Sequence, residues 1–126
     1  MPTPREIVER WYATLDPELV DPDTIWEIAA GSHAAGTWRG RRAVFEEYFP
    51  KLRAPFAVWG AEIESIHADG EIVFGLGHYT ARAHGAAESV AIPFCHVWWV
   101  SDGRITRARQ YADTVLLREA AAKGGR

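Results

Sequence analysis

The chain has 126 residues, of which 48% are hydrophobic and 25% charged, with a formal net charge of −3. This length and balance are typical of one globular domain over residues 1–126, and the charge argues against a nucleic-acid partner, which needs a broad basic surface. A single cysteine excludes an internal disulfide framework and a Cys-based zinc site, and no window approaches 18 apolar residues, so we expect a cytoplasmic protein with no membrane partner.

The first predicted helix begins at the N-terminus, in "TPREIVERWYATL". Thr3 suits the N-cap, Pro4 suits the first helical position, and Glu6 completes a capping box. Apolar residues then recur at helical spacing and form one stripe. Residues 16–24 contain two prolines and predict only one or two short helical turns.

Short strands and a second helix follow. The sequence predicts strands over residues 25–30 and 32–38. It then predicts an amphipathic helix over residues 40–52, with aromatic and aliphatic residues on one side and charged residues on the other.

After Pro55 the pattern changes to long β-rich runs. These predict strands over residues 56–68, 71–84, 88–100 and 104–113. Asp69-Gly70, a connection around Gly85 and Asp102-Gly103 separate them, and Asp-Gly between two such runs indicates a hairpin. We therefore expect a four-stranded antiparallel meander preceded by helices, with residues 115–126 as a frayed helical tail.

The length of these strands predicts a curved sheet. Twelve or thirteen residues at about 3.3 Å each would extend for roughly 40 Å, too far for a flat sheet in so small a domain. A coiled sheet with helices on its concave side is a cone with a cavity. The expected fold class is thus α+β, a cone-shaped antiparallel sheet packed on N-terminal helices, with room for a small molecule.

Two stretches, "GTWRGRRAVFEEYF" and "IPFCHVWWVSDGRITRARQYAD", resemble the SnoaL-like branch of the nuclear transport factor 2-like superfamily. The resemblance lies in an aromatic-Arg-Gly before the middle helix and in an aromatic-x-His strand followed by Asp-Gly-x-Ile. It covers nearly the whole chain in element order. Relatives include ketosteroid isomerases, polyketide cyclases, limonene epoxide hydrolases and scytalone dehydratases, so the resemblance implies the fold more strongly than any one activity.

The resemblance also argues against one reaction mechanism, that of the ketosteroid isomerases. Ketosteroid isomerases use an Asp base and a protonated Asp in an apolar pocket. Aligning "IPFCHVW" with their strand places Cys95 at the position of the protonated Asp, and a thiol is a weak donor. Near the expected base, the chain offers only Glu27 and His33. Isomerisation by that mechanism is therefore not expected.

The last long strand carries an acid in some relatives. An ungapped hairpin through Asp102-Gly103 places Gln110 on the same face as Cys95, toward the pocket, and turns Asp113 away. A one-residue bulge would reverse this relation. Both Gln110 and Asp113 remain candidates for the position of that acid.

The histidines are candidate proton shuttles. The chain resembles scytalone dehydratases in having histidines, His78 and His96, on two adjacent predicted strands. The face shared with Ile72 and Phe74 predicts that His78 points into the cavity. His96, next to Cys95, is expected on the outer face and is kept as a further catalytic candidate. His33 could replace the missing base near the pocket mouth. For each, the alternative is a partly buried histidine bonded to the backbone.

These observations lead to one main hypothesis and one alternative. The main hypothesis is a cofactor-free and metal-free enzyme that carries out isomerisation, cyclisation or dehydration on an apolar, oxygenated small molecule. Its catalytic candidates are His33, His78, Gln110, Asp113 and His96, and its substrate-binding candidates are Tyr12, Trp26, Trp38, Trp59, Cys95 and Trp99. The alternative is a non-catalytic ligand-binding or dimeric interaction domain of the same fold.

An aromatic outer sheet face is also expected. The ungapped register would place Phe94, Trp98 and Tyr111 there. Such a patch on a monomer would be unusually large, so we expect a homodimer formed through the sheet.

Overall fold

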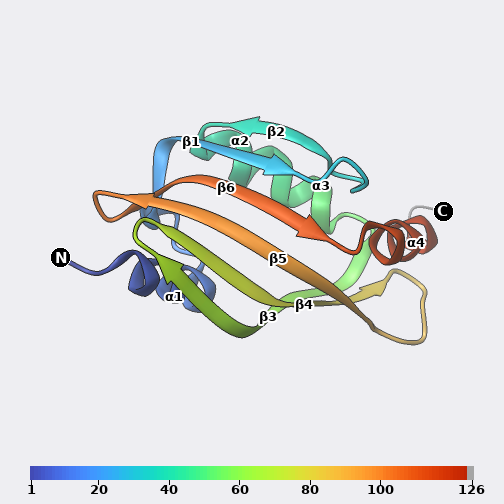
Figure 1. The fold of residues 1–126 in the computed structure, drawn as a ribbon. Helices are drawn as coiled ribbons and strands as arrows, with labels where there is room; N and C mark the ends of the chain where they lie inside the picture. The colour runs from blue at the N-terminus through green and yellow to red at the C-terminus, as the bar shows by residue number, and fades with distance from the viewer. Residues whose placement is uncertain (125–126) are drawn as a thin grey trace.

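The computed structural model describes residues 1–124. A curved six-stranded sheet, in the order β2-β1-β6-β5-β4-β3, is packed against helices (Figure 1). The predicted α+β fold is confirmed. None of the helices in residues 1–124 is long and apolar enough to cross a membrane.

Helix α1 (Pro4–Thr14) begins as predicted. The Thr3 hydroxyl accepts from the Glu6 N–H (3.2 Å), and the Glu6 carboxylate accepts from the Thr3 N–H (3.0 Å), which completes the capping box. Ile7, Val8 and Trp11 form its buried stripe. The helix lies against β3, β4, β5 and β6 and closes one end of the concave sheet face.

The segment after α1 is more extended than predicted. A single 3₁₀ turn, η1 (Pro17–Leu19), leads into β1 (Val20–Ile28). β1 pairs in parallel with β6 and antiparallel with β2 (Gly36–Arg39). The predicted strand over 32–38 is extended only at residues 36–38, because residues 32–34 form a local turn in which the Ser32 side chain accepts from the Ala34 N–H (3.0 Å).

The second predicted helix is interrupted. It consists of α2 (Arg41–Ala43), the π-helical turn η2 (Val44–Tyr48) and α3 (Phe49–Arg53). Pro50 has no N–H to donate to the carbonyl four residues earlier, so a regular α-helical ladder cannot run through it. The wide turn buries Tyr48, and such turns are frequent at functional sites.

The meander is confirmed. Its strands are β3 (Phe56–Asp69), β4 (Ile72–Ala83), β5 (Val90–Ser101) and β6 (Arg104–Ala112), all paired antiparallel. Asp102 and Gly103 both have positive φ (51° and 77°), as a type I′ hairpin turn requires. The long strands bend across the molecule instead of forming a flat layer (Figure 1).

The β5–β6 hairpin contains a bulge that the ungapped register lacked. Trp99 pairs with Arg107 whereas Val100 pairs with Ile105, so Thr106 is an extra residue on β6. The Thr106 hydroxyl donates to the Trp99 carbonyl oxygen (3.2 Å). Because side chains alternate between faces, the extra residue places His96, and not Cys95, opposite Gln110.

The C-terminal segment is an ordered helix where the sequence predicted a frayed tail over 115–126. Helix α4 (Thr114–Gly124) buries Leu117, Ala120 and Ala121 against the far end of the concave face. The last part of that prediction, residues 125–126, lies outside the described residues.

Candidate functional site

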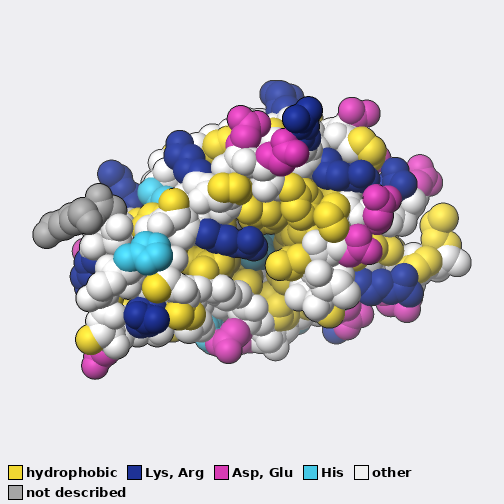
Figure 2. All heavy atoms as spheres, turned by 180° about the vertical axis from the view of Figure 1, so that it is seen from behind, with side chains coloured by type: hydrophobic (Ala, Val, Ile, Leu, Met, Phe, Trp, Pro, Cys, Tyr) yellow, Lys and Arg dark blue, Asp and Glu magenta, His cyan; other side chains and the backbone are white. Residues whose placement is uncertain are grey.

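A pocket of about 140 Å³ opens between the concave sheet face, α1 and α3. Figure 2 shows hydrophobic side chains gathered around a hollow on the face opposite to that seen in Figure 1. Its walls are mostly aromatic, with Trp11 packed edge-on to Trp26 (5.7 Å between ring centroids) and Trp26 edge-on to Trp98 (5.5 Å). An apolar cavity of this volume is large enough for a benzene-sized ring.

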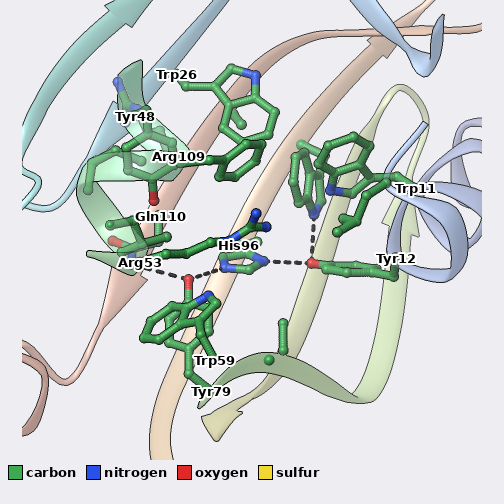
Figure 3. Close-up of a pocket in the computed structure, with 18 residues that line it drawn as sticks. Trp11, Tyr12, Trp26, Tyr48, Arg53, Trp59, Tyr79, His96, Arg109 and Gln110 are labelled. Carbon is green, nitrogen blue, oxygen red and sulfur yellow. Dashed lines mark hydrogen bonds between the residues drawn. The ribbon is translucent and has the colours of Figure 1, made fainter. Parts of the chain in front are cut away.

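A row of hydrogen-bonded polar groups lies on the floor of this pocket. The Tyr12 hydroxyl is 2.8 Å from His96 Nδ1, and His96 Nε2 is 2.6 Å from the Tyr79 hydroxyl (Figure 3). Each phenol oxygen also accepts from another side chain: Trp98 Nε1–H donates to Tyr12 (2.9 Å), and Gln110 Nε2–H donates to Tyr79 (3.2 Å). The row therefore joins α1, β4, β5 and β6 in one line of contacts.

The number of hydrogens in this row leaves one free donor. A neutral His96 has one ring hydrogen and each phenol has one, which makes three hydrogens for the two His–Tyr contacts. With the ring hydrogen on Nδ1, Tyr79 donates to Nε2 and the Tyr12 hydrogen is free. With it on Nε2, Tyr12 donates to Nδ1 and the Tyr79 hydrogen is free. The tautomer of His96 thus decides which end of the row can donate to a ligand.

Burial keeps all three groups neutral. Desolvation lowers the pKa of His96 from 6.5 to about 3. Burial also raises the pKa of Tyr12 and of Tyr79 well above the usual range of a phenol, although the hydrogen bonds from Trp98 and Gln110 oppose this. The site can donate and accept protons through neutral groups, with no fixed carboxylate among the pocket residues that the structure describes.

Two small features of the sequence position the row. A Cβ atom at Gly75 would lie 2.2 Å from the Tyr12 hydroxyl oxygen, so only glycine leaves room for that hydroxyl beside His96. Phe94 stacks on the His96 ring, with centroids 3.9 Å apart and an interplanar angle of 10°, and fixes the plane of the imidazole. Both positions lie on strand faces that point into the cone.

Five of the sequence candidates line the pocket. Tyr12, Trp26, Trp59, His96 and Gln110 do so, from four different strands and α1. Gln110 faces inward as expected. His96 also faces inward, and its expected placement on the outer face is wrong because of the bulge at Thr106.

Three other candidates lie on the outer sheet face. The same bulge turns Cys95 and Trp99 away from the pocket, so the expectation that they contact a ligand there is wrong. His78 pairs with Pro93 on β5 and also faces outward, where its Nε2 atom lies 2.5 Å from a Glu62 carboxylate oxygen. The expectation that His78 points into the cavity is wrong because the face that it shares with Ile72 and Phe74 is the outer one, and Val73 and Tyr79 face the interior.

The remaining candidates have local structural contacts. His33 Nε2 lies 2.9 Å from the Leu52 carbonyl oxygen, behind the pocket wall. Trp38 Nε1–H donates to the Ala34 carbonyl oxygen (3.2 Å) and does not line the pocket. The Asp113 carboxylate caps α4 by accepting from the Leu116 N–H (3.1 Å). Glu27 also points outward, where Arg107 and Arg109 donate to it, and their hydrogen bonds lower its pKa.

Several residues that line the pocket were not among the sequence candidates for it. Tyr79, the second phenol of the row, directly follows His78 on the strand. Because His78 was expected inside the cavity, Tyr79 was expected outside it. Trp98 was expected outside and lies inside for the same reason as His96. Tyr48 and Arg53 also line the pocket, and only the position of Tyr48 in the π-helical turn distinguishes it from ordinary core residues. Within residues 1–124, no group of three His, Cys, Asp or Glu side chains is placed to hold a metal ion.

Comparison with known protein families agrees with this fold. The model of the SnoaL-like domain matches residues 8–108 of the chain. The chain therefore belongs to the SnoaL-like domain family. No curated protein sequence matches it significantly.

Many solved structures share the fold. A nuclear transport factor 2-like (NTF2-like) protein from Burkholderia thailandensis has a TM-score of 0.85 and 28% identity, covering 95% of this chain and 98% of that one. An NTF2-like protein of unknown function from Burkholderia pseudomallei has a TM-score of 0.82 and 20% identity, with coverage of 96% and 98%. TerC, co-crystallised with polyporic acid, has a TM-score of 0.83 and 22% identity, with coverage of 95% and 99%.

Proposed function

We propose that this member of the SnoaL-like domain family is a small-molecule enzyme that transfers protons without a cofactor. The expected reactions are isomerisation, cyclisation or dehydration of an apolar, oxygenated substrate. The Tyr12–His96–Tyr79 row on the floor of an aromatic pocket carries this proposal. It replaces His33 and His78 as the leading acid/base pair, because neither of them reaches the pocket.

The row supplies a balanced proton transfer. In one step, the free Tyr12 hydrogen passes to a substrate oxygen, and the His96 Nδ1 hydrogen passes to Tyr12. The Tyr79 hydrogen passes to His96 Nε2, and a substrate C–H or O–H proton passes to the Tyr79 oxygen. The substrate loses a proton at one end of the row and gains one at the other, and the protein ends with His96 in its other tautomer and with no change in net charge.

The surroundings suit this role. A neutral histidine is a competent hydrogen-bond donor in catalysis, as the neutral imidazole in triosephosphate isomerase illustrates. Fixed donors in a pocket with aromatic walls also stabilise developing charge on a substrate oxygen more strongly than water does. One structural neighbour, TerC, was co-crystallised with polyporic acid, which supports a small organic ligand for this pocket.

Deuterium exchange at carbon tests the proposal with a probe that needs no natural substrate. We would incubate the protein with 2-tetralone in D₂O and follow loss of the C1 proton signal by NMR. The expected result is exchange faster than in buffer alone. His96→Gln should reduce the protein-dependent rate by about 100-fold or more, as loss of an acid/base group does.

Matched variants sharpen this experiment. His78→Gln removes an imidazole and Tyr111→Phe removes a phenol hydroxyl, both from the outer sheet face, so both variants should leave the exchange rate unchanged. Equal losses in His96→Gln and His78→Gln would contradict the assignment of the row.

A second candidate function is ligand binding without catalysis. It is favoured by one observation: burial makes His96 a weak base and both tyrosines weak acids. If 2-tetralone perturbs the pocket tryptophan signals but exchanges no faster than in buffer, binding without catalysis is the better account. The open cavity of about 140 Å³ argues against a domain whose cone is only a scaffold for protein interactions.

We also propose that the outer sheet face forms a homodimer. Leu76 and Tyr111 are 40% and 50% exposed there, and the guanidinium groups of Arg107 and Arg109 lie 5.0 and 5.9 Å from the centre of the Trp99 ring. Phe94 and Trp98, expected on this face, lie on the inner one. Sedimentation velocity should give a dimer that Tyr111→Lys converts to a monomer, whereas a wild-type monomer would contradict the proposal.

A further inference from the structure

Two polar groups of the pocket stand outside the Tyr12–His96–Tyr79 row. Tyr48 is 3% exposed and lines the pocket, and no hydrogen bond within residues 1–124 uses its hydroxyl. Arg53, from α3, lines the pocket mouth, and its guanidinium lies 5.0 Å from the centre of the Phe49 ring. Figure 3 shows the Arg53 side chain extending from α3 into the pocket.

No carboxylate in the described part of the chain forms an ion pair with Arg53. Within residues 1–124, the arginine–carboxylate contacts are made by other arginines: Arg5, Arg41, Arg42, Arg107 and Arg109. Arg109 also lines the pocket, but its guanidinium forms an ion pair with Glu27 on the outer sheet face. Arg53 is thus the cation that a ligand in this pocket meets without a competing carboxylate.

Tyr48 and Arg53 act on the same region of the pocket. Burial raises the pKa of the Tyr48 phenol well above its usual range, the nearby Tyr79 adds to this, and Arg53 opposes it. The phenol is therefore a neutral donor within the electrostatic reach of the guanidinium. Together the phenol and the guanidinium provide two hydrogen-bond donor groups and one positive charge, next to walls that are otherwise aromatic.

We propose that the pocket binds an apolar acid as its anion, with the negatively charged oxygen group facing Arg53 and Tyr48 and the apolar body against Trp11, Trp26 and Trp59. The inference concerns the pocket of the proposed function and names its ligand class: an aromatic or similarly apolar molecule with a carboxylate or an ionised enol. A charge-assisted hydrogen bond to arginine is stronger than one between neutral groups. Exclusion of water by the aromatic walls strengthens it further.

The test compares two probes of nearly equal shape, cinnamate and cinnamamide, which differ in charge. Titrations of the full chain would be followed through the indole N–H signals in ¹H–¹⁵N NMR spectra. The signals of Trp26 and Trp59 should move, and those of Trp38 and Trp99, which do not line the pocket, should stay. Cinnamate should bind about tenfold more tightly than cinnamamide, the preference that about 1.4 kcal/mol provides.

Charge-matched variants identify the source of the preference. Arg53→Gln should bring the cinnamate affinity down to that of cinnamamide while leaving cinnamamide binding unchanged. Lys51→Gln removes one positive charge from the same helix outside the pocket and should keep the tenfold preference. Tyr48→Phe should weaken cinnamate binding by a smaller factor, and added salt should reduce the preference in the wild type.

Several results would overturn the inference. These are equal affinities for the two probes in the wild type, an unchanged preference in Arg53→Gln, or no indole shift with either probe at millimolar concentration. The proposed proton transfer would still stand, because the 2-tetralone experiment measures it with an uncharged probe.

Discussion

His96 on β5 lies directly opposite Gln110 on β6, and both side chains point into the pocket. Tyr79 links them, since its hydroxyl contacts His96 Nε2 at 2.6 Å and accepts from Gln110 Nε2 at 3.2 Å. This pairing exists because Thr106 bulges out of β6. One inserted residue therefore decides that the pocket contains an imidazole in place of the Cys95 thiol.

Gly75→Ala should disrupt the row without touching any of its members. The new Cβ atom would lie 2.2 Å from the Tyr12 hydroxyl oxygen, so the phenol must move away from His96 and Trp98. We expect the Trp98 indole N–H signal to shift in NMR spectra and 2-tetralone exchange to fall at least tenfold. Leu76→Ala, on the outer face of the same strand, is the control. An unchanged Trp98 signal in Gly75→Ala would contradict the assigned position of Tyr12.

The buried His96 should make stability depend on pH. Its pKa is near 3 in the folded chain, whereas an unfolded histidine titrates near 6.5. Between these values the unfolded state binds the proton and the folded state does not, so the free energy of unfolding falls as the pH falls. The limiting slope for one group is about 1.4 kcal/mol per pH unit, and the effect is fully absent above the unfolded pKa.

Urea unfolding between about pH 7 and pH 4 measures this contribution. His96→Gln should lose stability less steeply than the wild type over that window. His67→Gln, an exposed histidine on β3, should follow the wild type. Parallel curves for the wild type and His96→Gln would show that His96 titrates normally in the folded chain.

Removing either phenol hydroxyl of the row should destabilise the fold. Tyr12→Phe leaves Trp98 Nε1–H without an acceptor, and Tyr79→Phe does the same to Gln110 Nε2–H. Each buried donor left without a partner costs about 1–3 kcal/mol. Tyr111→Phe, at an exposed position, should change the free energy of unfolding by less than about 0.5 kcal/mol. Chemical denaturation of the three variants decides between these values.

His33→Ala should affect stability and not exchange. His33 joins the β1–β2 connection to α3 through the Leu52 carbonyl oxygen, at 2.9 Å, and does not line the pocket. Loss of this hydrogen bond should cost about 1 kcal/mol. The rate of 2-tetralone exchange should stay at the wild-type value. A strong loss of exchange in a folded His33→Ala protein would return His33 to the site as a base.

Local signals in the sequence were enough for most of the fold. Thr3 and Glu6 identify the start of α1, and Asp102-Gly103 identifies the β5–β6 turn, because both depend on residues only a few positions apart. The interrupted helix around Tyr48 was less accessible. Pro50 gives a reason for a break, but the burial of Tyr48 by a π-helical turn depends on packing against the sheet.

The sequence by itself determined the antiparallel meander of the last four strands, the curvature that their length demands and the aromatic character of the cavity. Only the tertiary structure decided which set of alternate side chains on each strand faces that cavity. Side chains alternate with a period of two, so the bulge at Thr106 reverses the faces of β5 relative to β6, and the pairing of Gly75 with His96 then places the odd-numbered residues of β4 inside. His96 and Tyr79 face inward, and Cys95 and His78 outward, because long-range pairing and core burial choose the register, and no local pattern in the chain records that choice.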